Sequence, residues 1–355
     1  MEDKIRNLQR ELYATLKKAE KNRKKIQISR ILCYGGALIY FLGLIVMQFF
    51  VYSGKDTSFF YTLNPNPSIW EQYKMLIIIL PLFVLITLGG YGLSYFYKKY
   101  SDAEQASVRR IIGAMFPDAK LALLPSEVST SLLLQSNFFG GMDSRYRSGF
   151  SFGTVIFENN DRKITFRDLA INIGEPKNWL SQSSIGGLFL VFKMMFKGLF
   201  AARVENIASN FRGMFANAQI EKKINGSVVV LPDHLESRFD YLAKNIQALK
   251  NVNGNKLVML EDVEFERFFA VYASDEILAR YVLTPAMMLR MTELKKKYNR
   301  DIMLSFNGNQ FFFAVAMPEG FLTLGNASPD TGEALKDLYD NIVVAQGILN
   351  DLKIK

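Results

Sequence analysis

Two long uncharged apolar runs dominate the N-terminal third of the chain. Residues 31–52 contain no charged side chain, and residues 75–97 are again uncharged, with Pro81 and a glycine cluster at 89–92. About 20 apolar residues cross the hydrocarbon core of a bilayer, and proline and glycine are tolerated in such helices. The pattern therefore predicts a transmembrane hairpin: one helix at 31–52, a second at 75–97, and an extracytoplasmic loop at 53–74.

The segment before the first run has a different periodicity. In residues 1–30 apolar side chains recur at steps of three and four, which predicts an amphipathic helix. Its ten Lys and Arg residues outnumber four Asp and Glu, and Lys98 and Lys99 follow the second run. The positive-inside rule then places both chain ends in the cytoplasm. The basic cluster is either a topology signal or a site for anionic lipid.

Beyond the hairpin, the pattern predicts a cytoplasmic connecting helix at 98–117 and a cytoplasmic domain at 118–355. Short alternating segments predict strands, and a one-faced stripe predicts a helix after Pro232. The expected elements are strands at 150–157, 163–173, 198–204 and 227–231 and a helix at 233–250.

The final third has the clearest local signals. Thr284-Pro285 supplies an N-cap and an N1 proline for a helix that runs to Tyr298. Asn307-Gly308 between two apolar runs predicts a β-hairpin. Phe265–Tyr272 is expected to be a strand, Ser274 to cap a short turn, and Ser328-Pro329-Asp330 to begin the last helix. Hairpins mixed with helices, without regular βαβ alternation, predict an α+β domain with a mixed, mainly antiparallel sheet and packed helices.

Several strings in this domain resemble one family. They are Phe265-Glu266-Arg267-Phe268-Phe269-Ala270-Val271-Tyr272, Ala279-Arg280-Tyr281-Val282-Leu283-Thr284-Pro285 and Phe196-Lys197-Gly198-Leu199-Phe200. The chain resembles, over most of residues 30–350, a bacterial membrane-protein family catalogued as domain of unknown function number thirty-one thirty-seven. The resemblance implies two N-terminal spans in the inner membrane, a cytoplasmic α+β domain, and an unidentified membrane or envelope protein partner. It implies no reaction.

Charge and rare residues narrow the function classes. Of the net charge of +9, residues 1–30 carry +6, so the large domain is near neutral and no nucleic-acid partner is expected. Cys33 is the single cysteine and His234 the single histidine, which excludes an intramolecular disulfide and any multi-cysteine zinc site. Neither a cofactor nor a metal is expected, because no Rossmann, P-loop or calcium-loop spacing is present.

One motif matches a catalytic pattern by letter only. Residues 149–153, Gly-Phe-Ser-Phe-Gly, spell the hydrolase nucleophile motif, which requires a strand–turn–helix elbow and a later histidine. Here the motif lies within an alternating strand pattern, so Ser151 is expected to be an ordinary strand residue. We therefore predict no enzyme and no catalytic residue.

Two stretches are candidate sites. Arg280 lies between apolar strings and within reach of an acidic segment, so an ion pair with Glu264 or Glu266 is expected, with anion binding by Arg280 as the alternative. The stretch 185–200 is apolar with two lysines. It is either a buried strand or helix, or a membrane contact that uses Phe189, Phe192, Lys193, Phe196 and Lys197.

These observations favour a bacterial inner-membrane protein that presents a cytoplasmic binding or scaffolding domain at the membrane surface. The first alternative is a domain that senses lipid or a small ligand and contacts the bilayer through 185–200. The second is an enzyme of unrecognised type. Liposome flotation of residues 101–355 would distinguish the first alternative from the leading interpretation, if binding is lost when Phe189, Phe192 and Phe196 are changed to Ser.

Overall fold

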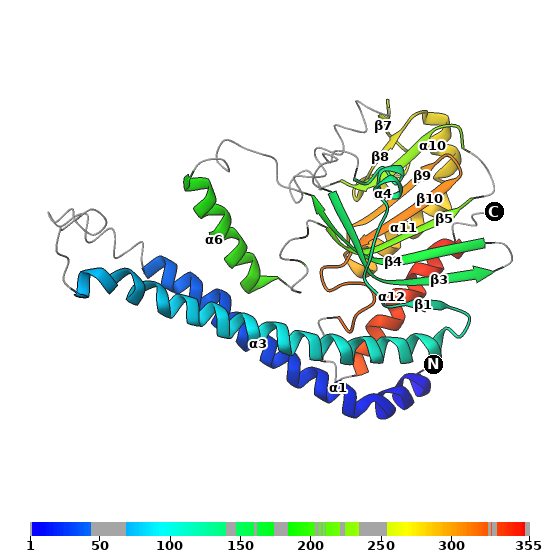
Figure 1. The fold of residues 1–355 in the computed structure, drawn as a ribbon. Helices are drawn as coiled ribbons and strands as arrows, with labels where there is room; N and C mark the ends of the chain where they lie inside the picture. The colour runs from blue at the N-terminus through cyan, green and yellow to red at the C-terminus, as the bar shows by residue number, and fades with distance from the viewer. Residues whose placement is uncertain are drawn as a thin grey trace. The chain divides into compact units, whose positions relative to one another are not determined.

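A computed structural model of the chain (Figure 1) divides into two compact units. Unit 1 comprises Met1–Tyr13, Glu104–Glu175 and Ala208–Lys355, and unit 2 comprises Ala14–Ala103 and Pro176–Ile207. The structure describes residues 2–43, 69–139, 147–159, 162–173, 184–201, 203, 206, 209, 211–220, 224–233, 254–325, 328 and 332–351. All but the first residue of the predicted helix at 233–250, and most of the predicted loop at 53–74, lie outside these residues.

Unit 1 is built on one antiparallel sheet. Over the described residues the sheet has ten strands in the order β1-β3-β4-β5-β10-β9-β6-β8-β7, with β2 paired to β3. Every pairing between these strands is antiparallel. The strands are β1 Lys120–Ala122, β2 Ser126–Glu127, β3 Arg147–Asn159, β4 Arg162–Ile173, β5 Phe211–Gln219, β6 Ser227–Pro232, β7 Lys256–Val258, β8 Phe269–Ala273, β9 Ile302–Asn307 and β10 Gln310–Ala316.

Helices accompany the sheet, which confirms the α+β class. The helices of unit 1 are α4 Thr130–Gln135, α9 Val263–Glu266, α10 Glu276–Val282, α11 Pro285–Tyr298 and α12 Gly332–Asp351. The predicted start of α11 is confirmed, because Thr284 Oγ1 accepts a hydrogen bond from Met287 N at 3.3 Å and Pro285 occupies the first helical position. The stripe of α12 is buried at Leu335, Leu338 and Ile342.

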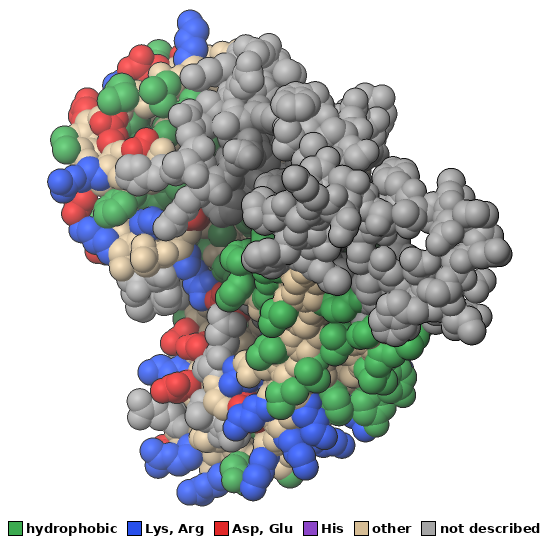
Figure 2. All heavy atoms as spheres, turned by 90° about the vertical axis from the view of Figure 1, so that its left-hand side faces the viewer, with side chains coloured by type: hydrophobic (Ala, Val, Ile, Leu, Met, Phe, Trp, Pro, Cys, Tyr) green, Lys and Arg blue, Asp and Glu red, His purple; other side chains and the backbone are tan. Residues whose placement is uncertain are grey.

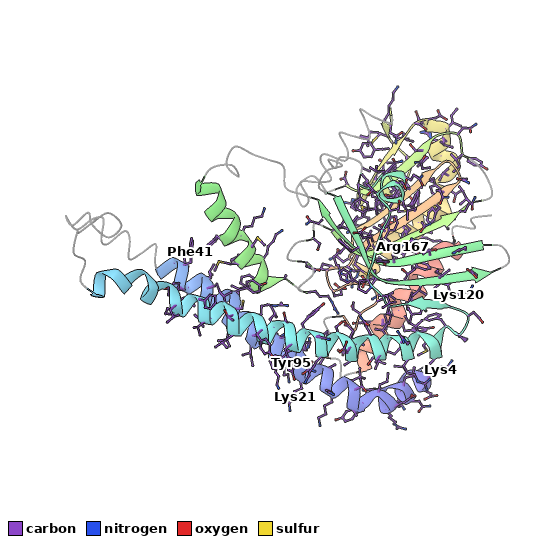
Figure 3. All side chains as sticks on the ribbon, viewed as in Figure 1. Lys4, Lys21, Phe41, Tyr95, Lys120 and Arg167 are labelled. Carbon is purple, nitrogen blue, oxygen red and sulfur yellow. The ribbon has the colours of Figure 1, made fainter. Side chains whose placement is uncertain are left out.

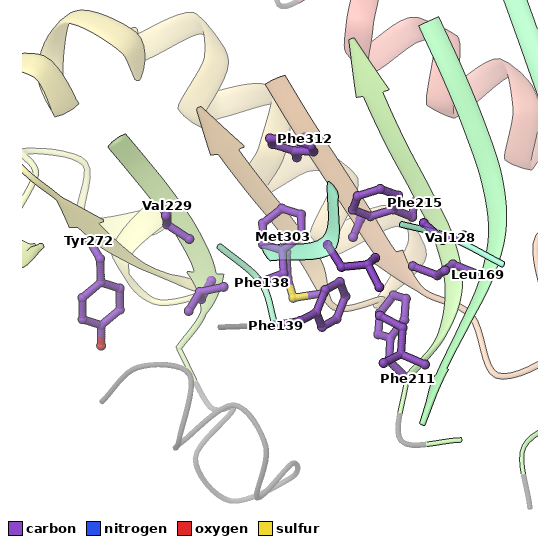
Figure 4. Close-up of a cluster of buried hydrophobic side chains, with 14 residues drawn as sticks. Val128, Phe138, Phe139, Leu169, Phe211, Phe215, Val229, Tyr272, Met303 and Phe312 are labelled. Carbon is purple, nitrogen blue, oxygen red and sulfur yellow. The ribbon is translucent and has the colours of Figure 1, made fainter. Parts of the chain in front are cut away.

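Aromatic side chains fill the sheet core. Phe138 and Phe139 meet Phe215 with ring centroids 6.5 and 6.4 Å apart, and Phe215 stacks on Phe312 at 6.1 Å (Figure 4). All four side chains are buried. A buried aromatic side chain contributes a large apolar area, so these contacts join α4's following turn, β5 and β10 into one cluster. Its other members include Val128, Leu169, Val229, Tyr272 and Met303.

Local details of the family strings differ from the sequence prediction. Phe265–Tyr272 is not one strand: Asp262 accepts hydrogen bonds from Glu264 N and Phe265 N, both at 3.0 Å, and so caps α9 before β8 begins. The cap of α10 is Asp275, which accepts from Leu278 N at 3.0 Å. Ser274 instead accepts from the backbone N–H of Ser227 at 3.1 Å. Asp275 rather than Ser274 is therefore the N-cap of α10, and both residue types are favoured at this position.

The predicted hairpin at Asn307-Gly308 is present with its loop one residue later. Asn307 pairs with Gln310, so the two-residue loop is Gly308-Asn309. Gly308 has a φ of 61°, and type II′ turns take glycine at this first loop position. The glycine therefore decided the turn, and Asn307 became the last residue of β9.

Unit 2 contains most of two long helices and a third helix packed on the first of them, whereas the start of α1 and the end of α3 from Glu104 belong to unit 1. Helix α1, Glu2–Arg30, continues through a π-helical turn, η1 Ile31–Gly35, into a helix that is described to Gly43. Helix α3 spans Ile69–Met115 and contains Pro81. The predicted connecting helix at 98–117 is therefore not separate, because nothing between Tyr97 and Ser101 breaks the helix. Among the described residues, one helix, Asp3–Gly43, is long and apolar enough to cross a membrane by length and composition.

Small residues let the two long helices approach closely. A methyl group added at Gly89 would lie 2.7 Å from Cβ and 2.8 Å from Cα of Cys33, while one added at Gly90 would meet nothing within 4 Å. Gly92 similarly faces Ser29. Close packing of this kind is typical of helices that associate within a membrane. Further along the pair, Ala19, Ile26, Leu93 and Tyr100 form a buried apolar cluster.

We expect Gly89→Ala to push the helices apart at Cys33, because the obstructing atoms are Cβ and the backbone Cα and N of Cys33, which no side-chain rotation can move aside. Cys33 is buried and is the single cysteine, so its rate of alkylation by N-ethylmaleimide in detergent reports on this contact. The rate should rise in Gly89→Ala and stay near the unmodified value in Gly90→Ala, a matched change on the neighbouring residue. Equal rates in the two variants would contradict the close approach.

Candidate membrane-contacting site

Helix α6, Ser184–Phe200, contains the candidate membrane contacts. Its strongly apolar composition and the four-residue spacing of Phe192, Phe196 and Phe200 favour a helix. The predicted strand at 198–204 is therefore wrong over its first residues, because the helical period extends through Phe200. This places the stretch 185–200 in a helix of unit 2 and removes a buried strand from the alternatives.

The C-terminal end of α6 packs against the first long helix at η1. A methyl group at Gly198 would lie 2.6 Å from the ring of Tyr34, so only glycine lets this ring rest on the α6 backbone. Leu199 faces Gly35 in the same contact. Arg30 Nη1 donates a hydrogen bond to the carbonyl of Ala201 at 2.6 Å, and a cation is favourable at a helix C-terminus. These contacts hold the last turn of α6 beside the first turn of the apolar run.

Large apolar side chains of α6 remain uncovered. Phe196 is 52% exposed and Phe200 is 71% exposed, and their rings lie against each other with centroids 4.7 Å apart. Met194 is also exposed, and Phe192, Lys193 and Lys197 are half-buried. The side chain of Phe189 lies outside the described residues. Exposed Phe and Met on one helix indicate a surface that is covered by something apolar.

Aromatic and basic side chains gather near the end of the second apolar run. The rings of Tyr91 and Tyr95 stack with centroids 6.2 Å apart, and Lys99 donates a hydrogen bond to the hydroxyl of Tyr95. Lys25 lies over the ring of Phe96, 4.8 Å from its centroid. Tyrosine and lysine together are typical of the boundary between a membrane and water. Figure 3 shows Phe41 in the apolar part of the helix pair, with Lys21 and Tyr95 toward its basic end.

Exposed apolar side chains lie on the same helices as these tyrosines and lysines. On one face of the molecule hydrophobic side chains form a continuous area, and Lys and Arg side chains gather below it (Figure 2). Within the described parts of the two uncharged runs, the exposed aliphatic and Phe residues are Ile31, Leu32, Ile39, Leu42, Leu80, Phe83, Val84, Ile86 and Leu88. Such an area is larger than scattered surface residues would produce, which indicates contact with lipid or protein.

The predicted partners of Arg280 are not those that the structure shows. Arg280 pairs with Glu276, one turn earlier on α10, at 2.8 Å, and also donates to the carbonyl of Met259 at 3.4 Å. Glu264 pairs with Lys296, and Glu266 accepts from the backbone N–H of Leu260. The i,i+4 spacing on one helix supplies a nearer carboxylate than the acidic segment does. Anion binding by Arg280 remains a prediction.

The other sequence candidates have ordinary surroundings where they are described. Ser151 is buried in β3, and its hydroxyl donates to the carbonyl of Gly153 at 2.8 Å, so no strand–turn–helix elbow surrounds it. His234 lies outside the described residues. Among the residues that the structure describes, no three His, Cys, Asp or Glu side chains gather as metal ligands.

Sequence reasoning missed a buried polar pair within the sheet. Asp168 on β4 accepts from Arg212 Nη2 on β5 at 2.8 Å and from Phe321 N at 2.9 Å. The guanidinium also lies 4.5 Å from the ring centroid of Phe152. The neighbouring Arg167 hydrogen bonds to Asn217, and burial lowers the pKa of the Arg167 guanidinium. The sequence signal that could have indicated this pair is the presence of charged residues inside two segments that otherwise read as strands.

Comparison with known proteins covers part of the chain. Residues 209–354 match the model of a family described as "Protein of unknown function (DUF3137)", which confirms the resemblance over that range. The matched range contains β5 to β10 and α12, whereas β1 to β4, α6 and both long helices lie before it. Comparison with curated proteins and with solved structures gave no match.

Proposed function

We propose that this chain, whose residues 209–354 belong to the DUF3137 family, is a multi-pass protein of the bacterial cytoplasmic membrane. In this proposal, it holds an α+β binding or scaffolding domain at the cytoplasmic surface. The single observation that carries the proposal is the long N-terminal helix, Asp3–Gly43, whose length and composition suit a membrane span. The family match supports the domain and carries no activity.

The second span would lie within α3. This helix has 47 residues, so it is about 70 Å long at 1.5 Å per residue, well beyond the roughly 30 Å of a hydrocarbon core. Its uncharged part, 75–97, packs on the first long helix at Gly89, and Phe83 and Leu88 are exposed. Its remainder carries Lys, Arg, Asp and Glu side chains suited to water. One continuous helix would therefore lead from the bilayer into the domain.

The charge distribution supports the orientation. Lys24, Lys25 and Arg30 come before the first apolar run, and Lys98 and Lys99 come after the second. Cytoplasmic flanks carry such an excess of lysine and arginine. Tethering in this orientation would raise the effective concentration of the domain toward partners at the membrane, which is the physical benefit that a binding or scaffolding role requires.

Single-cysteine labelling tests the topology. In a Cys33→Ser background, the variant Thr57→Cys should react with a membrane-impermeant maleimide in intact spheroplasts. The variant Lys336→Cys, at an exposed position on α12, should react only after lysis. Labelling of both positions before lysis, or of neither position before lysis, would contradict two spans with a cytoplasmic domain.

In vivo crosslinking tests the binding role. The full-length protein is compared with a chain that ends at residue 117 and keeps both predicted spans. A membrane protein that crosslinks only to the full-length chain, at stoichiometric yield, is the expected result. Turnover of a metabolite by the purified full-length chain, without such a partner, would favour an enzyme of unrecognised type instead.

A further inference from the structure

Helix α6 belongs to the unit that contains the long helices. Unit 2 includes Pro176–Ile207 although the neighbouring strands β4 and β5 belong to unit 1. Figure 1 shows α6 at an angle to the long helices, with its C-terminal end toward them. The contacts at Tyr34, Gly35 and Arg30 are all made by this end. The apolar helix is thus fastened to the first span at the edge of its uncharged run.

The strand connections indicate on which side of the membrane the chain enters and leaves α6. β4 and β5 are neighbours in the sheet, and Ile171 pairs with Phe211 where they come together. The chain that contains α6 leaves the sheet after Ile173 and returns at Phe211. Because the chain leaves β4 and returns to β5 at the same end of these neighbouring strands, we expect α6 to begin and end on the same side of the membrane. A transmembrane orientation would separate these ends by the whole bilayer.

The length of α6 agrees with this geometry. Its 17 residues extend about 26 Å at 1.5 Å per residue, less than the roughly 30 Å of a hydrocarbon core. Eleven of the 17 are Ile, Leu, Val, Met or Phe, and the charged residues are Lys193 and Lys197. A helix with an apolar body and a lysine pair on one face is typical of helices that lie in the membrane interface.

Resting on the proposed function, we propose that α6 is an interfacial helix of the cytoplasmic leaflet that binds phospholipid. Phe196 and Phe200 extend among the acyl chains, and Lys193 and Lys197 direct their ammonium groups toward the phosphates. Continuity with the first span supports lipid as the occupant, since Arg30 and Tyr34 hold the last turn of α6 at the boundary of the uncharged run. The sheet is thereby joined to the bilayer through β4 and β5 as well as through the long helices.

Spin labels on the full-length protein in phosphatidylcholine nanodiscs test the insertion. In the Cys33→Ser background, labels at Phe196→Cys and Phe200→Cys should lose accessibility to a water-soluble nickel reagent and stay accessible to oxygen. A label at Lys336→Cys is the water-exposed control. Nickel accessibility at 196 and 200 equal to that at 336 would overturn the proposal. So would shielding from both reagents, because that result means burial against protein.

A label at Leu42→Cys separates failure of this inference from failure of the proposed function. Leu42 lies in the first span, so it should be shielded from nickel whether or not α6 inserts. Nickel-accessible labels at both 42 and 196 would overturn the membrane anchor itself. A shielded label at 42 with an accessible label at 196 would overturn the insertion of α6 alone.

One further measurement avoids the risk that a cysteine variant misfolds, and a second, which uses the label at Phe196→Cys, assesses the lysines. In the unmodified protein, a phospholipid with a photoactivatable acyl chain should form adducts within 184–200, and adducts confined to the long helices would overturn the insertion. Adding phosphatidylglycerol to the nanodiscs should further lower the nickel accessibility of the label at 196. The double variant Lys193→Gln with Lys197→Gln should abolish this additional decrease. If the decrease caused by phosphatidylglycerol persists in the double variant, the assignment of the lysines to phosphates is overturned.

Discussion

Asp168→Ala should destabilise the sheet by about 3–5 kcal/mol, the usual cost of removing one partner from a buried ion pair. Asp168 is 1% exposed, and its carboxylate bonds to Arg212 Nη2 and to the backbone of Phe321. Arg212 is 6% exposed, and within the described residues its Nε and Nη1 have no hydrogen-bond partner. Removing the Asp168 carboxylate leaves the positive charge of Arg212 buried without this ion-pair partner.

Pulse proteolysis of the full-length protein in urea measures this loss. The double variant Asp168→Leu with Arg212→Met should recover much of the stability, because replacing both charges with apolar side chains leaves no buried charge behind. Lys120→Ala is the matched surface control: it breaks the exposed pair with Glu158, and the loss of such a solvent-screened pair is expected to change stability little. Equal losses for Asp168→Ala and Lys120→Ala would contradict a buried pair.

Gly213→Ala should be the second severe change. An added methyl group would lie 2.0 Å from the carbonyl oxygen of Val315 and 2.8 Å from the backbone nitrogen of Met317. Both atoms belong to the chain paired with β5, and Met317 N donates to the carbonyl of Arg212 at 2.9 Å. Relief of the clash therefore requires the two strands to separate. Overpacking costs about 1–3 kcal/mol, and more where backbone must move.

Gly149→Ala provides the matched control within the same sheet. Its added methyl group would meet Cδ1 of Leu133 at 2.6 Å, the end of a flexible side chain that can rotate away. The urea midpoint measured by pulse proteolysis should fall clearly further for Gly213→Ala than for Gly149→Ala. Similar midpoints would show that β5 and β10 accommodate a side chain at 213 without separating.

Local signals were the reliable part of the sequence. Thr284-Pro285 begins α11 as predicted, and the β9–β10 hairpin surrounds Gly308. Each of these features depends on residues a few positions apart, so the sequence contains the whole determinant. The shift of the loop to Gly308-Asn309 and the cap at Asp275 show the limit of such signals, since two adjacent candidates competed and only the backbone geometry selected one.

The candidate site was predicted in composition and missed in geometry. The apolar character of 185–200 and the lysines at 193 and 197 were visible in the sequence. The docking of Gly198 on Tyr34 and of Arg30 on Ala201 was not, because these residues are more than 160 positions apart. For the same reason, the sequence paired Arg280 with the wrong carboxylates.

The sequence by itself determined the apolar runs, the basic flank, the α+β class and the family resemblance, because periodicity, charge and local motifs are properties of neighbouring residues. Only the tertiary structure decided that Asp168 faces Arg212 across β4 and β5, that Gly89 lies against Cys33, and that α6 joins the long helices. These contacts depend on strand order and helix packing. Strand order and helix packing are set by the burial of apolar surface from the whole chain, so they cannot be derived from any single segment.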